Sequence, residues 1–274
     1  MDNNNLNNDS DQKLSEELSF FRIKEVLRNP SLVTGNFDSE HLKNLHAYIF
    51  QDSPEHKPGV VRKDEKDMWF KEREMESYTD SSGNLIKEPA HVVPYLHKGL
   101  NKELDKTLDK VNLKKISKLS QNDVSQELSN IYSKLDYIHP FHEGNSRTLR
   151  TFTHLMAKEL GYELDWNTTN VTPQSRNELY NSRDLEVLNH YYKGGLDDKF
   201  VKTAPLSQFE YTTAFRCLNW KKRTEPNSTK LSHIIRDSLS KINSESALEF
   251  SKQLKTSTPE PTIQIKNSIK KPEL

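Results

Sequence analysis

The stretch His139-Pro-Phe-His-Glu-Gly-Asn-Ser-Arg-Thr-Leu-Arg150 decides the fold of this 274-residue chain. Apolar residues at helical spacing flank it: Val124, Leu128, Ile131, Leu135 and Ile138 come before it, and Leu149, Phe152, Leu155, Met156 and Leu160 come after it. Because apolar residues three and four apart share one face of a helix, both flanking segments are expected to be buried helices. The stretch is therefore predicted to be a loop whose two ends are anchored in a helical core.

The side chains of this loop suit a polyphosphate, a metal ion and a base. Arg147 and Arg150 are three residues apart, so both can lie on one face of the following helix. The free N–H groups at that helix's N-terminus form an anion site, and Gly144 lets backbone amides approach phosphate oxygens. Glu143 can hold a divalent metal, and His139 titrates near neutral pH, as a general base must. The combination predicts nucleotidyl transfer.

Each of these residues alone has an ordinary interpretation. An isolated histidine at a helix end is usually a cap or a surface residue, and an arginine pair on a helix is usually solvated. A glutamate beside glycine is usually part of a turn. The functional interpretation depends on their joint occurrence between two amphipathic helices.

The rest of the chain is predicted to be mainly helical. Leu14, Leu18, Phe21 and Leu27 recur at roughly helical spacing, which predicts a first helix that ends at Asn29-Pro30. Prolines interrupt residues 53–98, where Met75–Thr79 and Leu85–Lys87 are predicted to pair as a small hairpin around a Gly-Asn turn. Further helices are predicted near 14–29, 39–49, 95–108, 173–192, 206–222 and 229–250.

Composition excludes several classes of protein. Lys+Arg and Asp+Glu are both 40, so the formal net charge is zero, which disfavours a non-specific nucleic-acid binder. The single cysteine, Cys217, excludes an internal disulfide framework. No run reaches the roughly 18 apolar residues of a membrane span, and the first residues do not resemble a secretory signal peptide. We expect action in a cytosol, either of the producing cell or of a host.

The stretch 139–150 resembles the signature of the Fic (filamentation-induced-by-cAMP) family, H-[PAF]-F-x-[DE]-[GA]-N-[GK]-R-x-x-R, at every position except Ser146. Segments 37–50, 58–62, 135–138 and 161–166 also resemble the family. The resemblance implies a mainly α, Fic-type helical bundle with a small β-hairpin flap. It also implies a protein adenylyltransferase, which transfers AMP from ATP to Ser, Thr or Tyr hydroxyls of a protein substrate.

The resemblance assigns a role to each residue of the loop. His139 would deprotonate the target hydroxyl, and Glu143 would hold Mg²⁺ on the α- and β-phosphates of ATP. Arg147 would bind the β/γ side of the donor, and Arg150 would support the site. The phosphate cradle would consist of Gly144, Asn145 and the amide of Ser146. Phe141 would anchor the loop in the core, and the hairpin at Ser77–Lys87 would be the flap that aligns the protein substrate.

Ser146 stands where the family usually has glycine. If the backbone there needs a positive φ, serine costs roughly 1–2 kcal/mol, although its hydroxyl can donate to a phosphate. We expect the chemistry to be retained, and Ser146→Gly to match or raise activity. The alternatives are a Fic-fold enzyme with another donor (UTP or GTP), a nucleotide-binding regulatory module disabled at Ser146, and, disfavoured by charge and loop length, a helical DNA-binding protein.

Many family members carry an inhibitory helix with the pattern [ST]-x-x-x-E-[GN]. Ser182–Glu186 matches its first part, but Val187 breaks it. We therefore predict a separate inhibitor protein, or none. The predicted organisation is a disordered segment 1–12, a Fic domain 13–205, a C-terminal helical extension 206–252 and a flexible tail 253–274.

Overall fold

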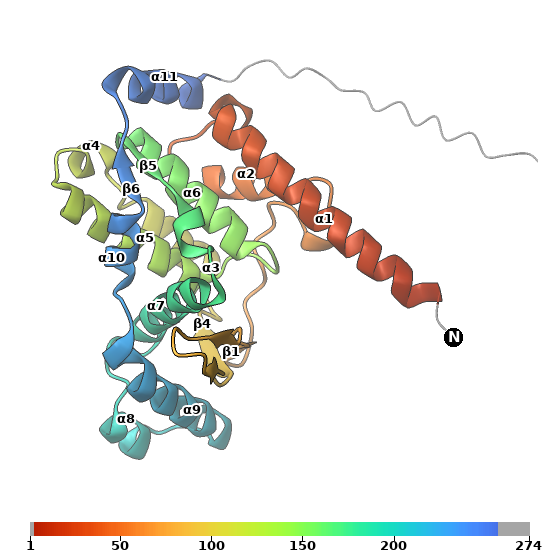
Figure 1. The fold of residues 1–274 in the computed structure, drawn as a ribbon, viewed down its shortest axis with the longest axis vertical. Helices are drawn as coiled ribbons and strands as arrows, with labels where there is room; N and C mark the ends of the chain where they lie inside the picture. The colour runs from red at the N-terminus through yellow and green to blue at the C-terminus, as the bar shows by residue number, and fades with distance from the viewer. Residues whose placement is uncertain (1–2, 257–274) are drawn as a thin grey trace, which may run out of the picture.

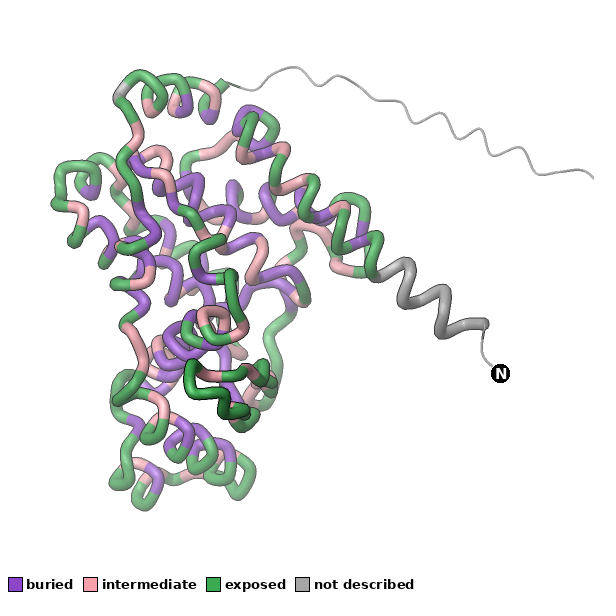
Figure 2. Tube along the Cα trace, viewed as in Figure 1, coloured by how far each residue is buried: buried purple, intermediate pink, exposed green. Residues whose placement is uncertain are grey.

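The computed structural model describes residues 3–256 and is mainly helical, as predicted. Its centre is the antiparallel pair α5 (Gln121–Ile138) and α6 (Asn145–Glu159), joined by the loop 139–144. Ser120 caps α5 by accepting from the Asp123 N–H, and Gly161, at φ +88°, follows the last residue of α6. Both predicted apolar faces are buried, and Figure 2 shows buried backbone concentrated here.

Three further helices pack around this pair. They are α2 (Ser39–Ile49), α3 (Leu100–Leu108) and α7 (Pro173–Tyr191). Asp38 caps α2 and Thr172 caps α7, with Pro173 in its first turn. The other helical elements are η1 (Pro30–Leu32), η2 (Pro54–His56), α4 (Leu113–Ile116), η3 (Trp166–Thr169), α8 (Asp198–Thr203), α9 (Gln208–Thr224), η4 (Glu225–Asn227), α10 (Leu231–Asp237) and α11 (Ser244–Lys255).

Helix α1 (Asn3–Arg28) differs from the prediction in extent. It continues across residues 3–12, which were expected to be disordered, because extending an existing helix needs no new nucleus. Its buried face carries Ser15, Ser19 and Val26, whereas Leu14 and Phe21 are each 54 % exposed. The predicted helix is thus present, and α1 places small polar residues as well as Val26 against the body of the protein.

The flap is larger than the predicted hairpin. At its tip β2 (Tyr78–Thr79) pairs with β3 (Leu85–Ile86) around a turn with Gly83 at φ +84°, which confirms the hairpin. At its base β1 (Trp69–Arg73) pairs antiparallel with β4 (His91–Tyr95), which was not predicted. Every residue of β4 is buried, and the strand delays the start of α3 to Leu100, so the helix predicted from residue 95 begins late.

The C-terminal region also differs from the prediction. The helix expected over 229–250 is interrupted by β6 (Leu239–Lys241), which pairs with β5 (Tyr162–Leu164) after α6. Leu231, Ile235 and Phe250 on either side of β6 pack in the main core, and Trp220 of α9 joins a second apolar cluster with α7. The domain division at 205 stays a prediction.

Helix α11 extends to Lys255, inside the predicted tail, and residues 257–274 of that tail lie outside the described part of the chain. Within the residues that the structure describes, no helix is both long and apolar enough to cross a membrane.

Candidate functional site

The residue that begins the loop, His139, is held by its own backbone. It ends α5 in the left-handed region at φ +48°, and its N–H donates to Leu135 O. The buried guanidinium of Arg62 donates through Nε to His139 O at 2.7 Å and through Nη2 to the carbonyls of Ile138 and Leu96. Arg62 thereby satisfies the free carbonyls at the end of α5 and fixes the direction in which His139 leaves the helix.

A side-chain clamp closes the loop. Asn145 Oδ1 accepts from the Phe141 N–H at 2.9 Å, and Asn145 Nδ2 donates to Phe141 O at 2.6 Å. Phe141 is fully buried, as expected of an anchor, and its ring stacks on His46 at 3.8 Å. Because the side-chain amide of Asn145 is used by the loop itself, Asn145 has its backbone N–H, rather than its side chain, to offer a phosphate.

His46 supports the loop from α2. The Gly59 N–H donates to His46 Nδ1 at 2.8 Å, so Nε2 carries the proton and donates to Glu143 O at 3.0 Å. Burial lowers the pKa of His46 to about 4. This imidazole is therefore neutral at pH 7, and its tautomer is set by the two backbone groups.

The loop, the flap and α7 enclose a cavity of about 200 Å³. Six of the seven predicted site residues line it: His139, Glu143, Gly144, Asn145, Ser146 and Arg147. Arg150 does not line it; the Arg150 carbonyl accepts from Trp166 Nε1 at 3.0 Å, and its guanidinium lies 5.9 Å from the Trp166 ring. The remaining lining residues were not predicted: Lys71, Arg73, Tyr95, Tyr180 and Arg183.

The N-terminus of α6 opens into this cavity. Gly144 is its N-cap at φ +78°, and Asn145, Ser146 and Arg147 form the first turn, whose N–H groups have no acceptor within the helix. Ser146 is not among the residues with positive φ. The strain considered for a serine at this position does not arise, because the positive φ falls on Gly144. The Ser146 hydroxyl instead accepts from Arg183 Nη1 at 3.4 Å.

Cations from three elements surround the cavity. Lys71 and Arg73 come from β1, Arg147 from α6 and Arg183 from α7. Arg147 Nη1 donates to Ser19 of α1 at 2.7 Å, a contact that the sequence did not indicate. Three of them have carboxylate partners: Lys71 pairs with Glu143, Arg73 with Asp184 and Arg183 with Asp136. Among the described residues Arg147 has no such ion pair, so it is the cation of this set that is left to attract a phosphate.

His139 is enclosed by the flap. Its ring lies 4.2 Å from the ring of Tyr95 and 5.2 Å from that of Trp69, and the residue is 7 % exposed. Neither ring nitrogen has a hydrogen-bond partner among the described residues, and Nδ1 lies 3.9 Å from Asp136 Oδ1. Burial lowers the pKa of His139 well below its usual value, and the nearby positive charges of Lys71, Arg62, Arg73 and Arg183 lower it further. His139 is therefore an unprotonated base at pH 7.

Glu143 is the one predicted metal ligand. Its side chain is 64 % exposed at the mouth of the cavity, with Lys71 Nζ 3.6 Å from Oε1. Over residues 3–256 no three His, Cys, Asp or Glu side chains form a metal-binding group. A single carboxylate suits Mg²⁺ when phosphate oxygens and water complete the coordination, so Glu143 fits a metal that arrives with a nucleotide.

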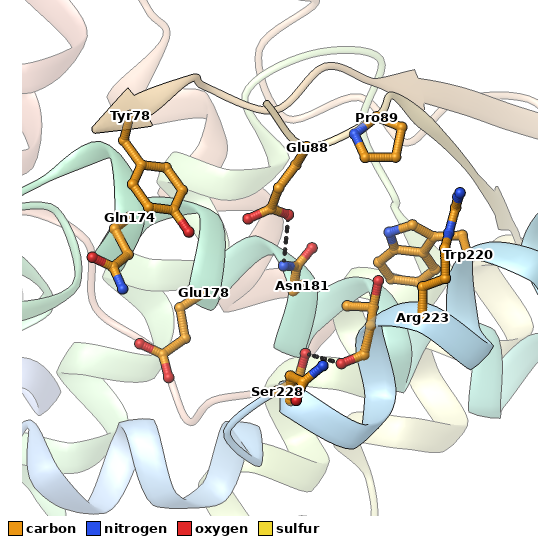
Figure 3. A pocket seen from close by; sticks show the side chains of 11 residues that line it. Tyr78, Glu88, Pro89, Gln174, Glu178, Asn181, Trp220, Arg223 and Ser228 are labelled. Atoms are coloured by element: carbon orange, nitrogen blue, oxygen red, sulfur yellow. Dashed lines mark hydrogen bonds between the residues drawn. The ribbon is translucent and has the colours of Figure 1, made fainter. Parts of the chain in front are cut away.

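A second cavity of about 410 Å³ lies apart from the loop (Figure 3). Tyr78 and Glu88 of the flap, Glu178 and Asn181 of α7 and Trp220 of α9 contribute to its walls. Asn181 Nδ2 donates to Glu88 at 3.0 Å across it. Its walls come from three distant segments, so no local sequence pattern indicates it, and it holds none of the predicted site residues.

Comparison with known proteins matches the central part of the chain to a family model. Residues 36–157 match the model of the Fic/DOC family. The chain is 27 % identical over 177 residues to the protein adenylyltransferase VbhT of Bartonella schoenbuchensis. The aligned region covers 62 % of this chain and 32 % of VbhT. It is 24 % identical over 159 residues to a protein adenylyltransferase of Bartonella henselae, and this aligned region covers 57 % of this chain and 28 % of that protein. The chain thus spans about a third of the length of these relatives.

Solved structures share the fold. The BepC protein of Bartonella tribocorum, a VirB-translocated effector solved with bound AMPPNP, superposes with a TM-score of 0.50 at 16 % identity. The alignment covers 86 % of this chain and 89 % of that one. At this identity the likeness establishes the Fic fold, and it confirms the mainly α bundle with a flap.

Proposed function

Because residues 36–157 of this chain form a domain of the Fic/DOC family, we propose that it is a protein adenylyltransferase that transfers AMP from ATP to a Ser, Thr or Tyr hydroxyl of a protein substrate. One observation carries the proposal. A single cavity holds the unprotonated imidazole of His139 and the first turn of α6 with Ser146 and Arg147. The base for the hydroxyl and the anion site for the donor are thus side by side.

Each residue of the cavity has a separate role in the proposed reaction. The substrate hydroxyl oxygen attacks the α-phosphorus of ATP, its proton passes to a ring nitrogen of His139, and the bond from the α-phosphorus to the bridging oxygen breaks to release pyrophosphate. The N–H groups of the first turn of α6, the Ser146 hydroxyl and Arg147 hold the phosphates through this change. Arg150 lies outside the cavity lining, so its role is to support α6 through Trp166.

Glu143 is the proposed ligand for Mg²⁺. When bound with ATP, the ion neutralises charge on the α- and β-phosphates. The exposed position of Glu143 at the mouth of the cavity supports this role, since the carboxylate reaches solvent and the phosphates from the same place. Lys71, 3.6 Å away, is the group that a bound ion would displace from Glu143.

The flap provides the surface for the protein substrate. Strand β1 pairs with β4 on one edge, and among the described residues no strand pairs with its other edge. Lys71 and Arg73 of the same strand line the cavity. An extended segment added to the free edge of β1 would therefore run beside His139. Glu186, the acidic residue considered for in-chain inhibition, lies half-buried on α7, so any inhibitor of this kind is proposed to be a separate protein.

The test uses ATP labelled at the α-phosphate or, separately, at the γ-phosphate, with Mg²⁺ and a cell lysate as the source of substrate. Label on protein from the α position alone, absent with His139→Ala, is the expected result. His139→Ala should lose at least ~10²–10⁴-fold in transfer and keep ATP affinity. Label from the γ position alone would show phosphorylation and overturn the donor orientation. Parallel reactions with labelled UTP and GTP test whether the donor carries a different nucleobase.

A further inference from the structure

A buried ion pair lies behind the catalytic loop. Arg183 of α7 donates to Asp136 of α5 through Nε at 3.0 Å and through Nη2 at 2.9 and 3.1 Å. The Asp136 side chain is fully buried and that of Arg183 is 3 % exposed. The two residues are 47 positions apart in the chain, and neither has a role in the signature.

Each member of the pair also faces one reacting end of the cavity. Asp136 Oδ1 lies 3.9 Å from His139 Nδ1, one helical turn further along α5. Arg183 Nη1 lies 3.4 Å from the Ser146 hydroxyl in the first turn of α6. His139, Asp136, Arg183 and Ser146 therefore form one continuous line of polar groups from the base to the phosphate cradle.

We propose that the Asp136–Arg183 pair is the positioning element of this site: Asp136 orients the imidazole of His139, and Arg183 orients the Ser146 hydroxyl toward the phosphates of the donor. The proposal rests on the proposed function for the identity of the donor and of the base. Asp136 acts through His139, whereas Arg183 contacts Ser146 and also lines the cavity itself.

The Arg183 contact determines what the Ser146 hydroxyl can do. A guanidinium has donors and no acceptor, so the serine oxygen must accept from it. The hydroxyl hydrogen is then left to donate to another group, and the cavity in front of it is the place for a phosphate oxygen. Glycine offers no such donor. The serine is thereby a functional replacement, and Ser146→Gly is expected to weaken donor binding, contrary to the expectation from the sequence.

The Asp136 contact determines which nitrogen of His139 is free. A proton on Nδ1 faces the carboxylate, which leaves Nε2 bare to accept the proton of the substrate hydroxyl. The charged and titratable groups that face the ring are Asp136 of α5, Arg183 of α7, Lys71 and Arg73 of β1, Tyr95 of β4 and Arg62 of the segment between η2 and β1. Asp136 is the one carboxylate in that set, and the 3.9 Å separation leaves room to shorten when the imidazolium forms.

The first experiment reads the tautomer of His139 from the nitrogen-15 shifts of histidine-labelled full-length protein, with His139→Ala to assign the signals. We expect Nδ1 protonated and Nε2 bare in the wild type. Asp136→Asn is expected to redistribute the proton between the two nitrogens. An identical tautomer in the variant would overturn the role of Asp136. This readout needs no substrate and no transfer, so it holds even if the proposed activity fails.

The second experiment measures binding of ATP with Mg²⁺ by calorimetry. Ser146→Gly and Arg183→Lys are each expected to weaken binding about tenfold, the typical effect of losing a hydrogen bond to a charged group. The double variant is expected to bind no more weakly than either single one, because both remove the same contact. Unchanged binding in Ser146→Gly, or additive losses, would overturn the role of Arg183. A wild type that binds no ATP would instead refute the proposed function.

A third variant separates positioning from stability. Asp136→Leu/Arg183→Met replaces the pair by apolar side chains of similar size, which in buried pairs is often neutral for folding. We expect a folded protein, by thermal unfolding, that has lost both the Nδ1–H tautomer and most of its affinity for ATP. A folded double variant with both properties intact would show that the pair serves the fold alone. If this variant fails to fold, Asp136→Asn and Ser146→Gly still decide the two roles.

Discussion

Gly144 and Phe50 are packed so closely that a β-carbon on residue 144 would lie 2.2 Å from Phe50 Cε2. Gly144 is also at φ +78°, a conformation that other residues adopt at a cost. Phe50 ends α2 and is itself fully buried, so it has no room to move away. Glycine is therefore required at position 144 for two reasons, its backbone conformation and its packing against Phe50. This turn directs the first N–H groups of α6 into the cavity.

Gly144→Ala is predicted to destabilise the protein and to abolish donor binding. The positive φ alone costs roughly 1–2 kcal/mol, and the overlap with Phe50 adds to it by forcing the loop out of place. Thermal unfolding and calorimetry with ATP measure the two effects. The matched control is Gly161→Ala, which has φ +88° but nothing within 4 Å of the added carbon. Equal effects at the two positions would show that packing against Phe50 is irrelevant.

Arg62→Lys is predicted to misplace the base while keeping the charge. Lysine cannot reproduce the planar fork that serves the carbonyls of His139, Ile138 and Leu96 together. Leaving buried carbonyls unpaired costs about 1–3 kcal/mol each, so we expect a lower unfolding temperature and a large loss of transfer. Lys63→Met, at the exposed neighbouring position, is the control. Wild-type transfer in Arg62→Lys would contradict this account of the loop.

Lys71→Met is predicted to shift the pH dependence of transfer. Lys71 is the largest charged contributor to the low pKa of His139, so its removal raises that pKa toward the ordinary value. Because the base works unprotonated, the acid limb of the rate profile should then move to higher pH. Lys66→Met, an exposed lysine that is not among the groups acting on His139, should leave the limb in place. A movement to lower pH would refute the assignment.

Acid is predicted to unfold the protein partly through His41 and His46. Burial lowers the pKa of each to about 4, below the value of about 6.5 expected in the unfolded chain. Their contribution is complete above pH 6.5 and is lost as the pH falls toward 4, by about 2 kcal/mol each at pH 5. Urea unfolding at pH 7 and pH 5 measures the loss. His46→Gln should show a smaller loss than the wild type, and an equal loss would contradict the prediction.

The predictable part of the site is the part made of contiguous residues. His139, Glu143, Gly144, Ser146 and Arg147 line one cavity because the loop is short and its ends are fixed by the helices that flank it. Those helices were predictable because their apolar faces repeat at the helical period. The first helix had the same kind of pattern, yet α1 exposes Leu14 and Phe21, since within residues 3–256 no other element covers that face.

The sequence by itself determined the helical pair and the loop between them, and it indicated the base that we propose, since these depend on neighbours within a few residues. Only the tertiary structure decided which distant groups meet the loop. Arg183 is 37 residues from Ser146, and Lys71 is 72 residues from Glu143. Strand β1 and helix α7 reach the cavity by packing, and packing also brings helix α1 into contact with Arg147. Packing buries apolar surface, and no local sequence period indicates which element will be the partner. The charge around the base, and with it the pKa of His139, is a property of that packing.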